Sequence, residues 1–283
     1  MLRAIQNILL QDSGRLIETL GLDPASARIE VQCLLQQVLK VSRAYLLAYP
    51  ERILSEPEQT LYDALLQRRL SGEPIAYILG EREFFGLSFK VTPATLIPRP
   101  ETELLVEMAL QRIPHDQTCH VLDLGTGSGA IAIAIAHERP KAIVLACDSA
   151  APALDVAREN AAQFLLSNLS FVASDWFQQI GGMRFDIIVS NPPYVSIGDL
   201  HLTQGDVRFE PLSALVSGPD GLHDIRWIIA HSKQHLKSNG WLLLEHGYDQ
   251  AAQVRELLRL GEFKDIFSAR DLSGIERVSG GAH

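Results

Sequence analysis

Between residues 119 and 245 the chain repeats one pattern, in which a short apolar run is followed by a segment with helical spacing. Apolar runs of this kind are typical of strands that are buried on both faces, and strands joined by crossover helices pair in parallel. The sequence therefore predicts an α/β domain on a mostly parallel sheet, with ligands bound beyond the carboxyl ends of its strands. The predicted strands are Cys119–Leu124, Ile143–Asp148, Leu169–Ser174, Phe185–Ser190 and Trp241–Glu245.

The first 72 residues have a different pattern, with apolar side chains three or four positions apart. This spacing predicts short amphipathic helices. Helix-start signals agree with it, because Asp23 precedes Pro24 as an N-cap precedes a first-turn proline. Ser55 and Glu58 have the spacing of a capping box.

These patterns divide the chain into three parts. Residues 73–100 have aromatic and apolar side chains on both sides of Gly86, followed by three prolines. That order predicts a β-hairpin leading into a stiff connection. We therefore expect a small all-α domain (residues 1–72), a β-hairpin linker (residues 73–100) and the α/β domain (residues 101–283).

The composition is that of a globular protein of a reducing compartment. Hydrophobic residues make up 47% of the chain, which permits a large core, and no apolar run approaches the roughly 18 residues of a membrane span. We expect no signal peptide and no membrane anchor. Cys33, Cys119 and Cys147 form no C-x-x-C pair, so we expect neither a disulfide framework nor a metal site.

The net charge of −9 is unevenly distributed. Basic and acidic residues balance over 1–72, so the whole excess of acidic residues lies in 73–283. A surface that binds a phosphate backbone is locally basic. We therefore expect no stable nucleic-acid binding.

A glycine-rich loop follows the first predicted strand and leads directly into a helix rich in Ala and Ile. Its glycines permit a tight turn and close approach to a ligand. Asp148, at the end of the second strand, has the spacing of a residue that holds ribose hydroxyls. The loose dinucleotide fingerprint fits the same residues, and a loop that only packs the helix on the strand is the plain alternative. The candidate residues of the loop are Asp123, Gly125, Thr126, Gly127, Ser128 and Gly129.

Two further groups follow the third and fourth strands. Asp175 can accept a hydrogen bond from the exocyclic amine of adenine while Trp176 covers the ring, although the pair can equally cap a loop. An Asn-Pro-Pro-Tyr run begins at Asn191. Two prolines remove two donors and keep the chain extended, which exposes the Asn191 side-chain oxygen and nearby carbonyls as acceptors. This arrangement suits an NH2 group, and redox chemistry does not call for it.

Together these motifs closely resemble those of the peptide chain release factor N5-glutamine methyltransferases, which use S-adenosylmethionine. Methyltransferases of adenine N6 and guanine N2 share the Asn-Pro-Pro-Tyr chemistry. The resemblance includes the segments LIPRPETE (96–103), DLHLTQGDVRFEPL (199–212) and LEHG (244–247). With the helical N-terminal module and the hairpin, it covers essentially the whole chain.

The resemblance implies a class I methyltransferase fold, with a seven-stranded, mostly parallel sheet, helices on both faces and an antiparallel last strand. It implies S-adenosyl-L-methionine as the cofactor, released as S-adenosyl-L-homocysteine. The implied substrate is the glutamine of the Gly-Gly-Gln motif in class 1 release factors, methylated at N5 in the cytoplasm. The run DSAAP (148–152) departs from the usual hydrophobic-Ser-Pro sequence, so we expect an altered loop shape there.

The resemblance also assigns roles to residues of the cofactor site. The loop Gly125–Gly129 would hold the methionine portion and Asp148 the ribose. Asp175 and Trp176 would hold the adenine. Arg99 lies between two prolines, and we expect it to cover the cofactor.

The substrate amide would lie on the Asn-Pro-Pro-Tyr loop. We expect the Asn191 side-chain oxygen and the Pro192 carbonyl each to accept one amide N–H, which orients the nitrogen towards the methyl group. Tyr194 would stack on the amide, or else only pack the loop. The expected catalytic residues are thus Asn191, Pro192 and Tyr194, and Pro193 completes the substrate-binding loop.

Three other functions are open to a chain with these motifs. An adenine N6 or guanine N2 methyltransferase of RNA or DNA would use nearly the same active-site chemistry, but the acidic balance and the LIPRPETE segment disfavour it. A module that only binds the cofactor would leave the Asn-Pro-Pro-Tyr loop without a role. A nicotinamide-dependent oxidoreductase would leave that loop unexplained.

Overall fold

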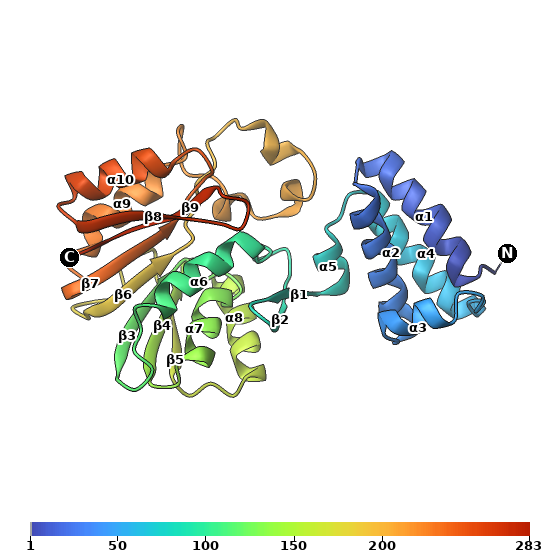
Figure 1. Ribbon diagram of the computed structural model, residues 1–283, viewed down its shortest axis with the longest axis horizontal. Helices are drawn as coiled ribbons and strands as arrows, with labels where there is room; N and C mark the ends of the chain where they lie inside the picture. Colours follow the sequence, from blue (N-terminus) through green and yellow to red (C-terminus); the bar gives the residue numbers. More distant parts are fainter. Residues whose placement is uncertain (1) are drawn as a thin grey trace. The chain divides into compact units, whose positions relative to one another are not determined.

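Figure 1 presents the computed structural model of the protein, which describes residues 2–283. The chain forms two compact units. The helical unit comprises Met1–Gly80 together with His201–Phe209, and the α/β unit comprises Glu81–Leu200 together with Glu210–His283.

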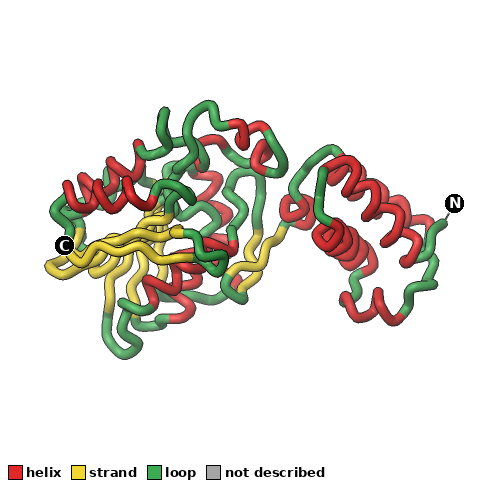
Figure 2. The backbone as a smooth tube through the Cα atoms, turned by 45° about the horizontal axis from the view of Figure 1, so that its top comes forward, coloured by secondary structure: helices red, strands yellow, loops and turns green. Residues whose placement is uncertain are grey.

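The helical unit packs its helices around one apolar core, and Figure 2 shows the predominance of helix in this part of the chain. The core side chains follow the predicted spacing, with Ile5, Ile8 and Leu16 of the first helix buried. The helices are α1 (Ile5–Leu20), α2 (Pro24–Leu39), α3 (Arg43–Ala48), α4 (Glu56–Leu70) and α5 (Ile75–Leu79).

Both predicted helix starts are confirmed. The Asp23 carboxylate accepts hydrogen bonds from the backbone N–H groups of Ala25 and Ser26, at 3.0 and 3.1 Å, and Pro24 begins α2. At the start of α4, the Glu58 carboxylate accepts from the Ser55 backbone N–H at 2.8 Å. These bonds satisfy backbone donors that a helix leaves unpaired at its first turn.

The helical unit continues to Gly80 because α5 contributes to its core. Ile78 of α5 is buried in the same cluster as the side chains of α1, α2 and α4. No helix was predicted between residues 73 and 80, which we had assigned to the β-hairpin linker.

The segment 201–209 is bound to the helical unit through a buried arginine. Arg69, whose side chain is 2% exposed, contacts Glu30 at 2.6 Å and Asp206 at 3.1 Å. Arg208 donates to the backbone carbonyl of Ser71 at 3.2 Å. One guanidinium therefore joins two helices to a segment that lies far away in sequence.

Within residues 2–283, the α/β unit contains one seven-stranded sheet. Its strand order is β5-β4-β3-β6-β7-β9-β8. Strands β3 to β7 pair in parallel, while β9 pairs antiparallel with both β7 and β8. The seven-stranded class I architecture with an antiparallel last strand is thereby confirmed. The strands are β3 (Cys119–Leu124), β4 (Ala142–Asp148), β5 (Leu169–Ala173), β6 (Phe185–Ser190), β7 (Leu236–Glu245), β8 (Lys264–Arg270) and β9 (Glu276–Ala282).

Helices cover both faces of this sheet (Figure 1). Alternate side chains of a strand point to opposite faces, so Val121 joins one apolar cluster and its neighbour Leu122 joins the other. Helices α6 (Glu103–Leu110), α7 (Ala130–Glu138) and α8 (Ala151–Gln163) pack in the first cluster. Helices α9 (His223–Ser232) and α10 (Ala251–Leu260) pack in the second.

The predicted hairpin is present as β1 (Glu81–Phe84) and β2 (Leu87–Lys90), with Gly86 in its turn. Its Phe84 and Phe89 are buried against the first face of the sheet. Short 3-10 turns complete the fold: η1 (Pro100–Thr102), η2 (Leu200–Thr203), η3 (Val207–Phe209) and η4 (Leu212–Ala214). Within residues 2–283, no helix has the length and apolar character needed to cross a bilayer.

Replacing the buried arginine tests how the segment 201–209 is held. We expect Arg69→Met to destabilise the helical unit by about 3 kcal/mol, because it leaves the Glu30 carboxylate buried without its partner. Trypsin should then cleave faster after Arg208, since Asp206 loses its anchor. Thermal unfolding and limited proteolysis measure the two effects.

Arg68→Met is the matched control, because the Arg68 side chain is 45% exposed and its ion pair is with Glu73. It should change neither stability nor cleavage appreciably. Equal behaviour of the two variants would contradict the anchoring role of Arg69.

Candidate functional site

A cavity of about 270 Å³ lies in the α/β unit, bordered by the carboxyl ends of β3, β4, β5 and β6. Parallel strands bring these ends to one edge of the sheet. The cavity brings together most of the residues that the sequence singled out. Those that line it are Gly125, Thr126, Gly127, Ser128, Asp148, Asp175, Trp176, Asn191 and Pro193.

The glycine loop is tied to the neighbouring strand by its backbone. The N–H groups of Gly125 and Thr126 both donate to the carbonyl of Cys147 in β4, each at 2.9 Å. The Asp148 carboxylate accepts from the Gly127 N–H at 2.9 Å and, through its other oxygen, from the Ala150 N–H at 2.9 Å. The carboxylate is thus fixed at the edge of the loop, facing the cavity.

Gly129 is required where the loop enters α7. Its φ of +84° favours glycine, and a Cβ atom there would lie 2.9 Å from the Ile133 side chain and 3.2 Å from Cβ of Ala157. The close approach of α7 to α8 therefore depends on the missing side chain. Gly129 does not itself line the cavity.

Trp176 lies beside the glycine loop, where a Cβ atom on Gly125 would be 3.5 Å from the indole ring. The preceding residue, Asp175, is exposed and accepts from Gln178 Nε2 at 2.9 Å. A flat ring and a carboxylate therefore stand together at the third strand end, as the sequence predicted.

Asp123 lies beneath the loop and does not line the cavity. Its Oδ2 accepts from the Thr126 hydroxyl at 2.6 Å, whereas its Oδ1 has no hydrogen-bond partner among residues 2–283. Burial raises the pKa of this carboxyl to about 7, and the Asp148 carboxylate adds to the rise.

The Asn-Pro-Pro-Tyr loop places its residues at different depths. Asn191 lines the cavity and donates through Nδ2 to Thr102 Oγ1 at 3.2 Å, which leaves its Oδ1 as an acceptor. Pro192 is buried and Tyr194 turns its hydroxyl to Glu245 Oε1 at 3.2 Å, and neither lines the cavity.

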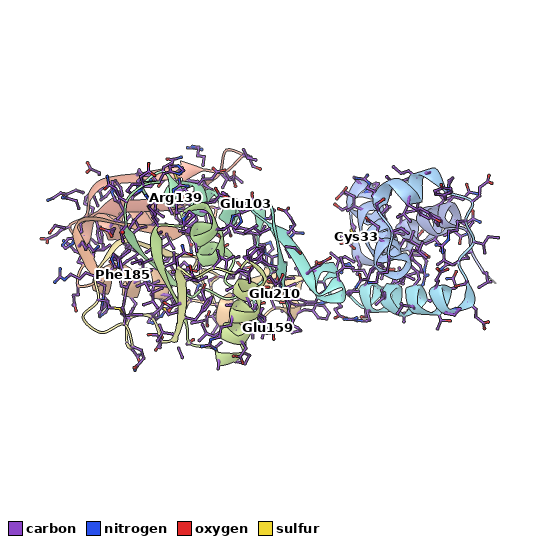
Figure 3. All side chains as sticks on the ribbon, turned by 90° about the horizontal axis from the view of Figure 1, so that it is seen from below. Cys33, Glu103, Arg139, Glu159, Phe185 and Glu210 are labelled. Atoms are coloured by element: carbon purple, nitrogen blue, oxygen red, sulfur yellow. The ribbon has the colours of Figure 1, made fainter. Side chains whose placement is uncertain are left out.

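Two of the three segments noted from the resemblance, LIPRPETE and DLHLTQGDVRFEPL, contribute residues to the cavity wall. Arg99 and Thr102 of the LIPRPETE segment line the cavity. Glu210, labelled in Figure 3, accepts from the Ile97 N–H at 3.0 Å and pairs with Arg99. The Glu210 side chain is fully buried, and its ion pair with Arg99 joins the two segments.

Sequence reasoning missed three polar residues of the site. Thr102 and Glu245 are buried and lie next to Asn191 and Tyr194 respectively, although both occur in motifs noted from the family resemblance. Asp224 lines the cavity from the start of α9 and accepts from the Ser217 hydroxyl at 2.7 Å. No local signal marked Asp224, because its position depends on how α9 packs.

Burial raises the pKa of the Glu245 carboxyl to about 7, with the Glu101 carboxylate raising it further. The next residue, His246, is fully buried and bonded at both ring nitrogens, to the Gly247 carbonyl and the Ser279 hydroxyl. It therefore has a structural role. Across the part of the chain that the structure describes, no cluster of three or more His, Cys, Asp and Glu side chains suits a metal ion.

Two family models match this chain. The model of the Methyltransferase small domain matches residues 101–206, and that of the PrmC N-terminal domain matches residues 15–80. The second match falls on the helical unit.

Curated relatives match nearly the whole chain. A release factor glutamine methyltransferase of Pseudomonas aeruginosa is 50% identical over 257 residues, which are 91% of this chain and 93% of the relative. One of Xylella fastidiosa (strain Temecula1) is 48% identical over 254 residues, with 90% and 92% covered. Among solved structures, a 16S rRNA methyltransferase of T. thermophilus, in complex with AdoMet and guanosine, aligns with a TM-score of 0.54 at 19% identity. That alignment covers 71% of this chain and 49% of the other, and it shows a shared fold.

From the raised pKa of the buried Asp123 carboxyl we predict an unusual dependence of the free energy of unfolding on pH. Its pKa is about 7 in the folded protein against an ordinary 3.8, so between these values the folded state holds a proton that the unfolded state has lost. The free energy of unfolding should therefore fall as pH rises from about 4 to 7, by at most about 1.4 kcal/mol per pH unit for one group. Asp123→Asn should flatten this slope in urea unfolding measured without ligand.

Asp220→Asn is the matched control. Asp220 is an exposed carboxylate whose pKa is lowered to about 2 by its hydrogen bond with Arg226, so its contribution to stability is lost only in strong acid. The slope between pH 5 and 7 should be that of the wild type. A wild-type slope in Asp123→Asn would rule out the buried carboxyl as its source.

Proposed function

Because the chain belongs to the family of release factor glutamine methyltransferases, we propose that it methylates N5 of the glutamine in the Gly-Gly-Gln motif of class 1 release factors. S-adenosyl-L-methionine is the methyl donor and S-adenosyl-L-homocysteine the product. The observation that carries the proposal is identity of 47–50% over about nine-tenths of the chain with relatives of that name. Translation termination takes place in the cytoplasm, so we place the reaction there.

The cavity fits this cofactor. Asp148 offers a fixed carboxylate for the ribose hydroxyls, and Trp176 with Asp175 offers a ring and an acceptor for adenine. The loop Gly125–Gly129 exposes backbone for the methionine portion, and the unpaired Oδ1 of Asp123 lies beneath it. When bound, the cofactor supplies a methyl group that its sulfonium has already activated.

The protein must also act on the substrate amide. Its nitrogen is a poor nucleophile, because the lone pair is delocalised into the carbonyl. We assign the Asn191 side-chain oxygen and the Pro192 carbonyl to accept one N–H each. The two bonds orient the nitrogen and favour the positively charged transition state. The methylated nitrogen is strongly acidic, so its proton leaves to water afterwards and the step needs no general base. Tyr194 does not line the cavity and donates its hydroxyl to Glu245, so we assign it to packing of this loop.

We assign recognition of the release factor to the helical unit. Residues 15–80 match the PrmC N-terminal domain model, so this unit is a separate module from the methyltransferase domain. A short Gly-Gly-Gln loop offers little binding energy of its own, and contacts remote from the glutamine supply what it lacks. The acidic excess of residues 73–283 supports our expectation that nucleic acid is not a stable partner.

Transfer of a radiolabelled methyl group tests the proposed substrate. We expect label on purified class 1 release factor and none on RNA or DNA under the same conditions. The control is a release factor whose motif glutamine is changed to alanine, which should stay unlabelled. Label on nucleic acid alone would replace the proposal with an amino-group methyltransferase of nucleic acid.

Substitution of Asn191 tests the chemistry. Asn191→Ala removes one preorganised acceptor and should slow the reaction about a hundredfold, or about 3 kcal/mol. Asn191→Asp keeps an acceptor and should react faster than alanine but slower than wild type. Single-turnover rates at saturating cofactor give the comparison, and cofactor affinity measured by calorimetry should change far less. An alanine variant as fast as wild type would make Asn191 a structural loop residue.

A further inference from the structure

We propose that Gln250 is a positioning residue that holds the Asn-Pro-Pro-Tyr loop in place through the backbone carbonyl of Tyr194. The inference rests on the proposed function, because Asn191 and Pro192 of that loop are assigned to the substrate amide. Gln250 lies outside the motifs noted from the sequence, and it does not line the cavity.

The side chain of Gln250 connects three loops. It is 7% exposed and lies at the N-cap of α10. Its Nε2 donates to the Tyr194 carbonyl at 3.0 Å and, at a longer 3.5 Å, to the Asp220 carbonyl. Its Oε1 accepts from the Gly247 N–H at 2.8 Å. One amide group therefore joins the loops that follow β6 and β7 to the loop that precedes α9.

The two ends of this amide have different roles. The bond to Gly247 is local, and it closes the same turn in which the Gln250 N–H donates to the Gly247 carbonyl at 3.1 Å. The bond to Tyr194 connects positions 56 residues apart. A side chain that only closed the turn before α10 would need an acceptor and no donor. The Nε2 donor is therefore the part of Gln250 that acts on the substrate loop.

The chain leaves room for this bond at Gly221. A Cβ atom on Gly221 would lie 2.2 Å from the Tyr194 carbonyl oxygen and 2.8 Å from Gln250 Nε2. Both separations are far shorter than a van der Waals contact. The φ of +73° at Gly221 also favours glycine. The missing side chain therefore permits Gln250 and Tyr194 to meet.

With this bond, both ends of the substrate loop are held. At its start, the Ser190 hydroxyl donates to the Leu124 carbonyl at 2.7 Å. At its end, the Tyr194 N–H donates to the Leu215 carbonyl at 3.1 Å, while the Tyr194 carbonyl accepts from Gln250.

The two prolines between these ends make the loop stiff, because each has a fixed φ angle. A shift of the Tyr194 carbonyl is therefore poorly absorbed between the ends and reaches Pro192 and Asn191. These are the residues assigned to the substrate N–H groups. A misplacement of about 1 Å at such a contact costs about a hundredfold in rate.

Gln250→Glu removes the donor and keeps the local bond. A glutamate has nearly the same shape and can still accept from the Gly247 N–H, but at about pH 8 it turns a charged oxygen to the Tyr194 carbonyl. We expect single-turnover methylation of release factor, at saturating cofactor and release factor, to slow about 10- to 100-fold. Affinity for S-adenosylmethionine, measured by calorimetry, should be retained. Gln253→Glu is the matched control, because Gln253 is exposed on α10 and undergoes the same change of charge; its rate should be that of wild type.

Gln250→Met decides the matter even if Gln250→Glu does not fold. Methionine has a similar volume and no donor in any protonation state, so this variant should slow the reaction to a similar degree. A Gln250→Met enzyme as fast as wild type would overturn the inference.

A double-mutant cycle with Asn191 separates this role from a general loss of structure. In Asn191→Ala the side-chain oxygen that the loop places is already absent, so Gln250→Met should cost at least about threefold less in rate there than in wild type. The same fold loss in both backgrounds, or a loss of cofactor affinity in step with the rate, would overturn the inference.

The same measurements distinguish this inference from the function on which it rests. A wild type that labels no release factor would overturn the proposed function itself. An active wild type, with Gln250→Met at the same rate, would overturn only the role of Gln250.

Discussion

The parallel alignment of β3, β4, β5 and β6 is the constraint on which the site depends. It brings four strand ends to one edge, and short bonds then fix the loops that follow. The Cys147 carbonyl holds Gly125 and Thr126, while the Ser190 hydroxyl donates to the Leu124 carbonyl at 2.7 Å. Because these bonds join neighbouring strands, the cofactor loop and the Asn-Pro-Pro-Tyr loop keep a fixed separation.

Three buried carboxyl groups lie close to this edge of the sheet. Asp123, Glu210 and Glu245 are all at most 4% exposed, and burial disfavours the charged form of each. Glu210 is compensated by Arg99, whereas Asp123 and Glu245 each have one oxygen without a partner in the described residues and a pKa raised to about 7. Such groups weaken the folded state, and their clustering at the cavity is typical of a functional site.

The stretch of chain that leads from the Asn-Pro-Pro-Tyr loop to Glu210 belongs partly to each unit. It leaves the α/β unit after Leu200, contributes residues 201–209 to the helical unit, and returns at Glu210. Asp206 is held by Arg69 on the first side of this passage and Glu210 by Arg99 on the second. The segment that follows Asn191 in sequence is therefore covalently continuous with the unit to which we assign recognition of the release factor.

The sequence by itself determined the strands and helix starts that depend on residues close together in the chain. Apolar runs bounded by turns predicted β3 to β6, and Asp23 with Pro24 predicted the start of α2, because burial and capping depend on neighbours in sequence. It did not predict β8 or β9, whose residues are mostly half-buried or small, nor the polar first half of β7. Those segments become strands because an adjacent strand supplies their hydrogen bonds.

The candidate site divides in the same way. Asp148, Trp176 and Asn191 could be predicted because strand ends of a parallel sheet converge, and the structure brings all three to one cavity. The joining of Asn191 to Thr102, and of Tyr194 to Glu245, was decided only by the tertiary structure. Both pairs connect positions far apart in the chain, and their contact follows from the order of the strands and the packing of η1, which no local pattern encodes.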